Sequence, residues 1–66
     1  MTLSDVSTSY GDARRDARTA RTVRLRIVER RLRRRRDQLS QPELAYLSGI
    51  RDELRDRGID LPELFA

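Results

Sequence analysis

The sequence predicts an all-α fold, an antiparallel two-helix hairpin that dimerises into a four-helix arrangement. Three observations predict it. Residues 12–39 contain no Gly or Pro, so one long helix can run through them. Apolar residues recur at helical spacing on both sides of Ser40. Ser40 itself opens a helix-start sequence, and the chain after it is again free of breakers up to Gly58, apart from Pro42 and Gly49.

The first predicted element is the long helix, over about residues 12–39. Residues 1–11 are rich in Ser and Thr and show no apolar period, which predicts a flexible N-terminal tail. Asp12 then stands before a run of good helix formers and is a suitable N-cap. Residues 12–66 are therefore expected to form a single helical-hairpin domain.

The second predicted helix covers about residues 41–57. Ser40-Gln-Pro-Glu43 is a capping box, with Pro42 in the first turn, where its missing N–H has no cost. Gly58 supplies the left-handed residue of a Schellman cap, and Ile59 and Leu54 are spaced for its apolar contact.

A short C-terminal helical turn is expected after the second helix. Asp60-Leu-Pro-Glu63 repeats the order of a cap residue, a proline and a glutamate. This pattern predicts one more helical turn over residues 61–65.

The apolar faces predict how the two helices pack. Folding back at Ser40 brings one face of each helix together in three layers. The expected hairpin core consists of Leu25, Val28, Leu32, Leu39, Leu44, Leu47, Ile50 and Leu54.

Residues 12–23 extend beyond the reach of the second helix in this register. Their small side chains, and a second stripe further along, predict contact with another protomer. The expected self-association residues are Ala13, Ala17, Ala20, Val23 and Ile27. An alternative cover for the overhang is the C-terminal group of Leu61, Leu64 and Phe65.

The charge is concentrated in the stretch Arg14–Arg36, which holds twelve arginines against two acids, Asp16 and Glu29. Local ion pairs are expected for Glu29 with Arg33, and for Asp37 with Arg33 or Arg34. In the second helix they are expected for Asp52 with Arg55 and for Glu53 with Arg57. The remaining positive charge surrounds the helix and predicts contact with an anionic partner. The expected anionic-partner residues are Arg14, Arg15, Arg18, Arg21, Arg26, Arg30, Arg33, Arg34 and Arg36.

Several chemistries have no residues to carry them. The chain has no His and no Cys, and its three glycines are isolated, so neither a metal site, a thiol nucleophile nor a phosphate loop is expected. We therefore expect a protein that is not an enzyme and needs no cofactor. No basic, apolar leader and no long apolar run occurs, which predicts a cytoplasmic protein without a membrane span.

Two function classes fit these observations best, and no motif identifies a family. The first is a small regulatory or adaptor protein that binds a larger acidic protein through the arginine-rich hairpin. The second is a DNA-binding protein whose arginines contact phosphates. A lesser alternative is an arginine-lined dimer pocket for a phosphorylated ligand. A solvated basic face without a partner, or a helix lying on an anionic membrane, would explain the same charge.

Overall fold

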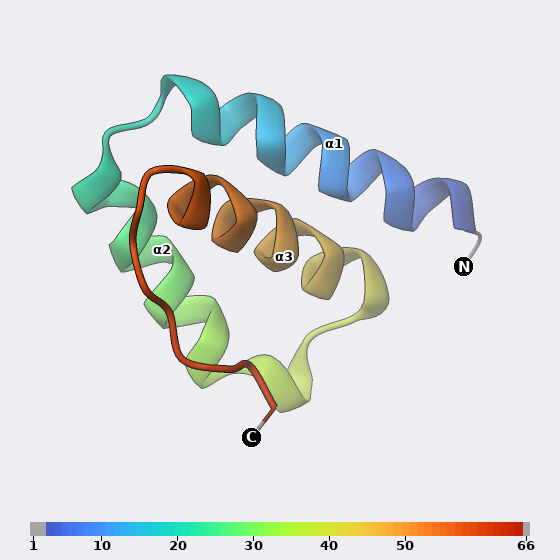
Figure 1. The fold of residues 1–66 in the computed structure, drawn as a ribbon. Coiled ribbons are helices and arrows are strands. Elements are labelled where there is room, and N and C mark those ends of the chain that lie inside the picture. Colours follow the sequence, from blue (N-terminus) through green and yellow to red (C-terminus); the bar gives the residue numbers. More distant parts are fainter. Residues whose placement is uncertain (1–2, 66) are drawn as a thin grey trace.

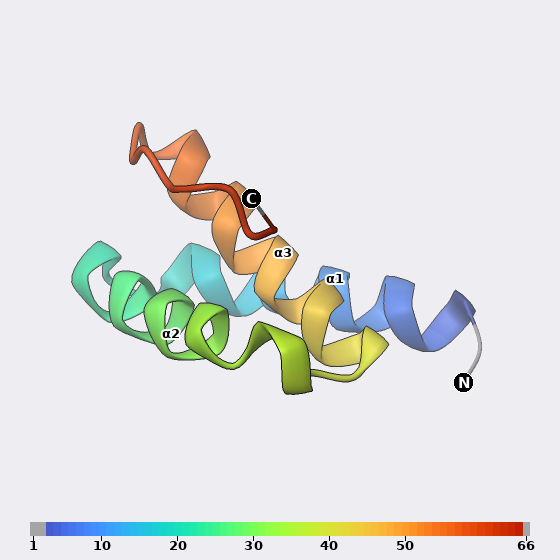
Figure 2. The same cartoon turned by 90° about the horizontal axis from the view of Figure 1, so that it is seen from below.

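The computed structural model describes the backbone of residues 3–65 and the side chains of residues 8–65, and this part of the chain is all-helical, with three α-helices and no strand. The helices are α1 (Leu3–Thr19), α2 (Thr22–Arg34) and α3 (Gln41–Asp56). A 3-10 turn, η1 (Arg36–Gln38), links α2 to α3. α1 and α3 pack against each other, and both run from right to left in Figure 1. α2 comes between them in the sequence and runs downward from the left side of that view, and Figure 2 shows the three helices from below.

The single helix predicted over residues 12–39 is wrong. The chain is already helical from Leu3, inside the predicted tail, and residues 1 and 2 of that tail lie outside the described residues. The helix is then interrupted at Ala20 and Arg21, where Arg21 has extended backbone angles of φ −70° and ψ 147°. Two helices at an angle therefore replace one straight rod.

Arg57, at the end of α3, accounts for this interruption. Its guanidinium donates hydrogen bonds to the carbonyl oxygens of Ala17 (2.7 Å) and Ala20 (2.9 Å) and to the Thr22 hydroxyl (3.0 Å). The last carbonyls of a helix have no donor inside that helix, so an outside donor stabilises the end. Because this donor comes from a distant part of the chain, the break needs neither Gly nor Pro.

Small residues let α1 and α3 approach closely. Ala13 is 0% and Ala17 1% exposed, and both belong to the core cluster with Ile50 and Leu54 of α3. A Cβ atom on Gly49 would lie 2.7 Å from the Ala13 Cβ, so α3 has no room there for a larger residue. The predicted overhang is therefore wrong, because α1 packs on α3 of its own chain and leaves Ala13 and Ala17 inaccessible to a second protomer.

Two tyrosine–aspartate hydrogen bonds tie α1 to α3 in opposite senses. The Tyr10 hydroxyl of α1 donates to Asp52 of α3 at 2.5 Å, and the Tyr46 hydroxyl of α3 donates to Asp16 of α1 at 3.2 Å. The hydrogen bond to Asp52 raises the pKa of Tyr10, and burial raises the pKa of Tyr46. Both tyrosines therefore stay protonated donors at neutral pH.

The residues expected to form the hairpin core divide into two groups. Leu25, Leu47, Ile50 and Leu54 are buried. The others, which lie nearer the link between α2 and α3 or at the edge of α2, are partly buried: Val28, Leu32, Leu39 and Leu44.

The predicted start of the second helix is confirmed. The Glu43 amide donates to the Ser40 hydroxyl, and the Ser40 amide donates back to the Glu43 carboxylate, at 3.4 and 3.1 Å. The Ser40 hydroxyl also lies 2.7 Å from that carboxylate, and this hydrogen bond lowers the pKa of Glu43. The negative charge of Glu43 therefore sits at the N-terminus of α3, where the helix dipole favours it.

The predicted end of the second helix is confirmed as well. Gly58 has a positive φ of 85°, and the Ile59 amide donates to the Leu54 carbonyl at 3.0 Å, as in a Schellman motif. Ile59 also packs against the cluster that contains Leu54.

The helical turn predicted for residues 61–65 is wrong. This segment has no helical residues, turns back from the end of α3 and passes α2 (Figure 1). The Pro62 carbonyl accepts a hydrogen bond from Arg51, and Leu61 packs against the core. These tertiary contacts hold the segment in a non-helical conformation.

Candidate functional site

The arginines nearest the core hold helices together. Arg51 of α3 and Glu29 of α2 are 3% and 2% exposed, and their Nη1 and Oε2 atoms are 2.9 Å apart. Arg51 also donates to the Pro62 carbonyl, and Arg33 Nε lies 3.7 Å from the same Glu29 oxygen. This buried ion pair joins α2, α3 and the C-terminal segment at one point.

A second group of ion pairs joins α1 to the end of α3. Arg14 Nη2 is 2.8 Å from Asp56 Oδ2, and Arg14 Nη1 is 3.7 Å from Glu53 Oε2. Arg57 Nε reaches Glu53 at 3.3 Å. The hydrogen bond to Asp56 raises the pKa of Arg14. Arg14 was predicted to face a partner, but in the structure it is engaged within the chain.

The predicted pair of Asp37 with Arg33 or Arg34 is wrong, since among the side chains of residues 8–65 Arg33 pairs with Glu29 and Asp37 has no guanidinium within 4 Å. Three other predicted local pairs are confirmed. They are Glu29 with Arg33, Asp52 with Arg55, and Glu53 with Arg57, at 3.7, 3.6 and 3.3 Å.

The arginines of α2 point elsewhere. Nine arginines have no carboxylate within 4 Å among the side chains of residues 8–65. Most of these arginines belong to α2 or to the turn after it. These are Arg18, Arg21, Arg24, Arg26, Arg30, Arg31, Arg34, Arg35 and Arg36. All are exposed except Arg36, which is partly buried and donates to the Arg33 carbonyl at 3.1 Å. The outer surface of α2 is therefore the main unneutralised cationic region of the described chain.

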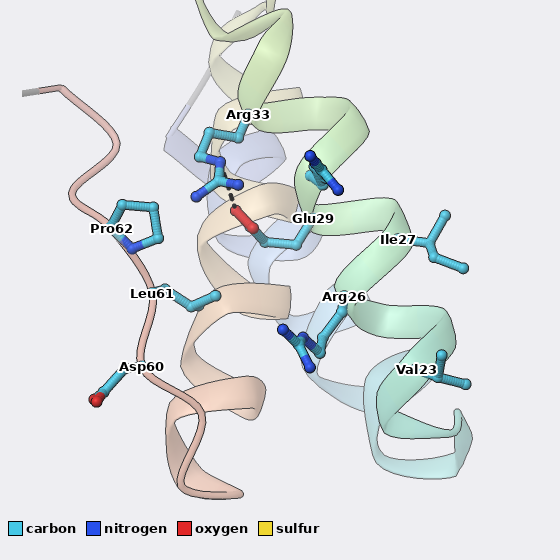
Figure 3. A pocket seen from close by; sticks show the side chains of 9 residues that line it. Val23, Arg26, Ile27, Glu29, Arg33, Asp60, Leu61 and Pro62 are labelled. Atoms are coloured by element: carbon cyan, nitrogen blue, oxygen red, sulfur yellow. Dashed lines mark ion pairs between the residues drawn. The ribbon is translucent and has the colours of Figure 1, made fainter.

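Two aliphatic side chains stand among these arginines. Val23 is 66% and Ile27 50% exposed, although both are on a helix whose other face is packed. Figure 3 shows them pointing away from the C-terminal segment, while Arg26 turns towards it. The exposed face of α2 thus combines positive charge with apolar surface, which is the composition of a contact surface more than of a solvated one.

A hollow of about 430 Å³ lies between α2 and the C-terminal segment. Arg26, Arg30 and Arg33 line it from α2, and Leu61 and Pro62 line it from the opposite side. Asp60 also borders the hollow, but its carboxylate points outward (Figure 3). Glu29 also lines the hollow, but its carboxylate is paired with Arg33 and Arg51. The lining guanidinium groups with no carboxylate within 4 Å among the described side chains are therefore those of Arg26 and Arg30.

The predicted anionic-partner residues fall into two sets, apart from Arg36, which is partly buried and hydrogen-bonded to the Arg33 carbonyl. Arg14 and Arg33 are largely covered and paired, and Arg15 lies 3.9 Å from Asp12 at the surface. The exposed set is Arg18, Arg21, Arg26, Arg30 and Arg34. Arg24, Arg31 and Arg35 join this set in the structure, although the sequence prediction omitted them.

The buried pair of Glu29 and Arg51 was not predicted, although the sequence carries a signal for it. Glu29 lies between Leu25 and Leu32 on the apolar face of its helix, and Arg51 follows Ile50 on the apolar stripe of α3. Opposite charges on two facing apolar stripes indicate a buried ion pair.

Comparisons with protein-family models, with curated proteins and with solved structures each find no match. Within residues 3–65, no helix is both long and apolar enough to cross a bilayer. The same part of the chain holds no group of three or more potential metal-ligating side chains. The fold and surface of the described residues are those of a small all-α protein with a cationic face on α2.

Proposed function

We propose that this protein is a non-enzymatic regulatory or adaptor protein that binds a larger acidic protein through the outer face of α2. One observation carries the proposal: the exposed arginines of this face have no carboxylate within 4 Å among the described side chains, and Val23 and Ile27 are exposed beside them.

The charge distribution supports an anionic partner. Residues 22–38 hold eight arginines and two acids, whereas α1 holds three of each and α3 holds two arginines and four acids. Like charges three and four residues apart on one helix destabilise it by a few tenths of a kcal/mol per pair. Binding to an acidic surface removes this repulsion and gives the arginines bidentate partners.

Nucleic-acid binding is the alternative function. The exposed arginines suit phosphates, and each neutralised phosphate would release a counterion. The apolar pair Val23 and Ile27 favours a protein instead, because a phosphate backbone offers no apolar surface to cover it. The alternative would be established if the protein bound random duplex DNA more tightly than any acidic protein, and if this affinity for DNA fell steeply with rising salt.

The predicted homodimer and the phosphorylated-ligand pocket are separate proposals. After the burial of Ala13 and Ala17, the exposed self-association surface reduces mainly to Val23 and Ile27. A two-fold contact there would bring two cationic α2 helices together, which is unfavourable without an anion between them. Sedimentation of the pure chain with and without inorganic phosphate tests both proposals at once.

The function is tested by co-purification from the cells that produce the protein, after nuclease treatment. The charge-reversed variant carries Arg30→Glu and Arg34→Glu on α2. A matched control carries Arg15→Glu and Arg18→Glu on the exposed side of α1. We expect a defined acidic protein to co-purify with the wild type and with the α1 control, and to be absent from the purified α2 variant. Equal retention by both variants would contradict the proposal.

A further inference from the structure

The outer face of α2 carries two neighbouring rows of side chains with different chemistry. Val23 and Ile27 form an apolar row, and Arg26 and Arg30 form a cationic row. The members of each row are four residues apart, so they are separated by about 6 Å along the helix axis. All four side chains are exposed and all border the hollow beside the C-terminal segment.

The opposite side of α2 is fully used by the fold. Leu25 and Glu29 are buried there, and Val28 and Leu32 pack against the core cluster. The two exposed rows are therefore not needed for packing within the described chain. An aliphatic pair that stays in water gives no stability to the monomer, since burial is what makes apolar groups favourable.

We propose that the two rows bind an amphipathic acidic helix of a partner protein. Such a helix would place an acidic pair, four residues apart, against Arg26 and Arg30. Beside it, an aliphatic or aromatic pair with the same spacing would cover Val23 and Ile27. This inference rests on the proposed function and specifies the secondary structure and side-chain pattern of its partner.

A helix fits this surface better than an extended acidic peptide. Side chains of a strand alternate between opposite faces, so an extended peptide presents one row to a surface. A helix presents two adjacent rows at once, spaced like those of α2 itself. The combination of a two-row surface and complementary charge therefore favours a helical occupant.

The other occupants of this face fit less well. A second copy of α2 would oppose arginine with arginine. An anionic membrane would attract the arginines, but the face offers two aliphatic residues and no aromatic residue to enter the bilayer interface.

The test measures binding of fluorescent synthetic peptides to the full chain at physiological salt. The probe is an amphipathic peptide of Glu, Leu and Ala in which Glu and Leu form adjacent rows at four-residue spacing. One control peptide has the same composition with the rows scrambled, and a second has every Leu replaced by Ala. Random duplex DNA and anionic phospholipid vesicles complete the set.

Two double variants separate the contributions of the rows. Val23→Gln with Ile27→Gln removes the apolar row, keeps the charge and places better helix formers at these exposed positions. Arg26→Gln with Arg30→Gln removes the cationic row. We expect the amphipathic peptide to bind roughly tenfold to a hundredfold more tightly than either control peptide, as two covered aliphatic side chains imply. We expect the variant without the apolar row to show no preference among the peptides. We expect the variant without the cationic row to bind all three peptides more weakly. Unchanged circular dichroism shows that each variant is folded.

Three results would overturn the inference. Equal binding of ordered and scrambled peptides, unaffected by the loss of the apolar row, would refute the two-row surface but leave the proposed function intact. Binding of DNA without binding of any acidic peptide would refute both. Tighter binding to vesicles than to peptides, lost with the apolar row, would identify a membrane surface instead.

Discussion

Arginine has opposite roles on the two helices that meet at Ser40. On α3, Arg51 is 3% exposed and paired with Glu29, and Arg57 at its end donates to two carbonyls at the end of α1 and to the Thr22 hydroxyl of α2. On α2, Arg30 and Arg34 are exposed and have no carboxylate within 4 Å among the described side chains. The role of an arginine is thus decided by the acceptors that the fold places in front of it. A count of charge along the chain therefore does not locate the unpaired cationic face.

The largest effect is expected from Arg51→Ala. It leaves the Glu29 carboxylate buried without its main partner, which costs about 3–5 kcal/mol of unfolding free energy. A domain of this size has roughly 3–10 kcal/mol in total at typical values per residue. We expect partial or complete loss of the urea-unfolding transition, measured by circular dichroism.

The double variant Glu29→Leu with Arg51→Met is the control for that prediction. Replacing both charges with apolar groups should restore stability to near or above the wild type. If the Arg51→Ala variant is as stable as the wild type, the buried arginine of α3 contributes no more to stability than the exposed arginines of α2.

The next effect concerns Arg57, which acts on the junction between α1 and α2. Arg57→Met keeps an unbranched apolar stem but removes the guanidinium and its hydrogen bonds to Ala17 and Ala20. Loss of hydrogen bonds to a charged group should cost about 1.5–3 kcal/mol. Amide hydrogen exchange should accelerate around residues 17–22 first. Arg55→Met, at an exposed position of the same helix, is the matched control and should leave exchange there unchanged.

Two glycines test how closely α1 and α3 pack. Gly49→Ala would place a methyl group 2.7 Å from the Ala13 Cβ and 2.9 Å from the Tyr10 carbonyl oxygen. Overpacking of this kind costs about 1–3 kcal/mol, against a gain of up to about 1 kcal/mol from helix propensity. Gly11→Ala meets nothing within 4 Å and should give the gain alone. Denaturant midpoints that move in the same direction for both would contradict the close approach.

Local signals in the sequence predicted the local features of the fold. The capping box at Ser40 and the left-handed Gly58 each depend on residues within five positions, and both are present in the structure. Asp60-Leu-Pro-Glu63 has the same order of residues but forms no turn of helix. The residues after Ser40 form an amphipathic helix that packs on the core, whereas after Asp60 the packing of Leu61 and the hydrogen bond from Arg51 to the Pro62 carbonyl hold the chain in a non-helical conformation.

The features that the sequence did not predict depend on distant contacts. The break at Ala20 is held by Arg57, and no local residue type marks it. A continuous helix would leave Ala13 and Ala17 without a partner in their own chain, and a second protomer was predicted for that reason. The cationic face was predicted in part, since periodicity places arginines on a helix but does not show which ones meet a carboxylate.

A smaller effect should appear in the pH dependence of the α3 cap. The Ser40 hydrogen bonds lower the pKa of Glu43, so the charged form stabilises the folded state. This contribution is complete above the ordinary glutamate pKa of about 4.3 and is lost as the pH falls through the lowered folded value. Glu43→Gln should therefore melt below the wild type at neutral pH, and the two should converge in acid. Glu63→Gln, at an exposed position, should show no such convergence.

The smallest effect, and the one of opposite sign, is expected on the outer face of α2. Arg34→Gln removes a charge that lies three and four residues from Arg31 and Arg30, so it should stabilise the isolated chain by about 0.2–0.5 kcal/mol at low salt. The gain should disappear at high salt, where exposed charges are screened. Thermal melts at two salt concentrations measure both. A loss of more than about 1 kcal/mol would mean that Arg34 has a structural partner in the fold, and α2 would then resemble α3. A stabilised variant that binds the acidic amphipathic peptide more weakly would instead support the proposal that this arginine contacts another molecule at the expense of the stability of the fold.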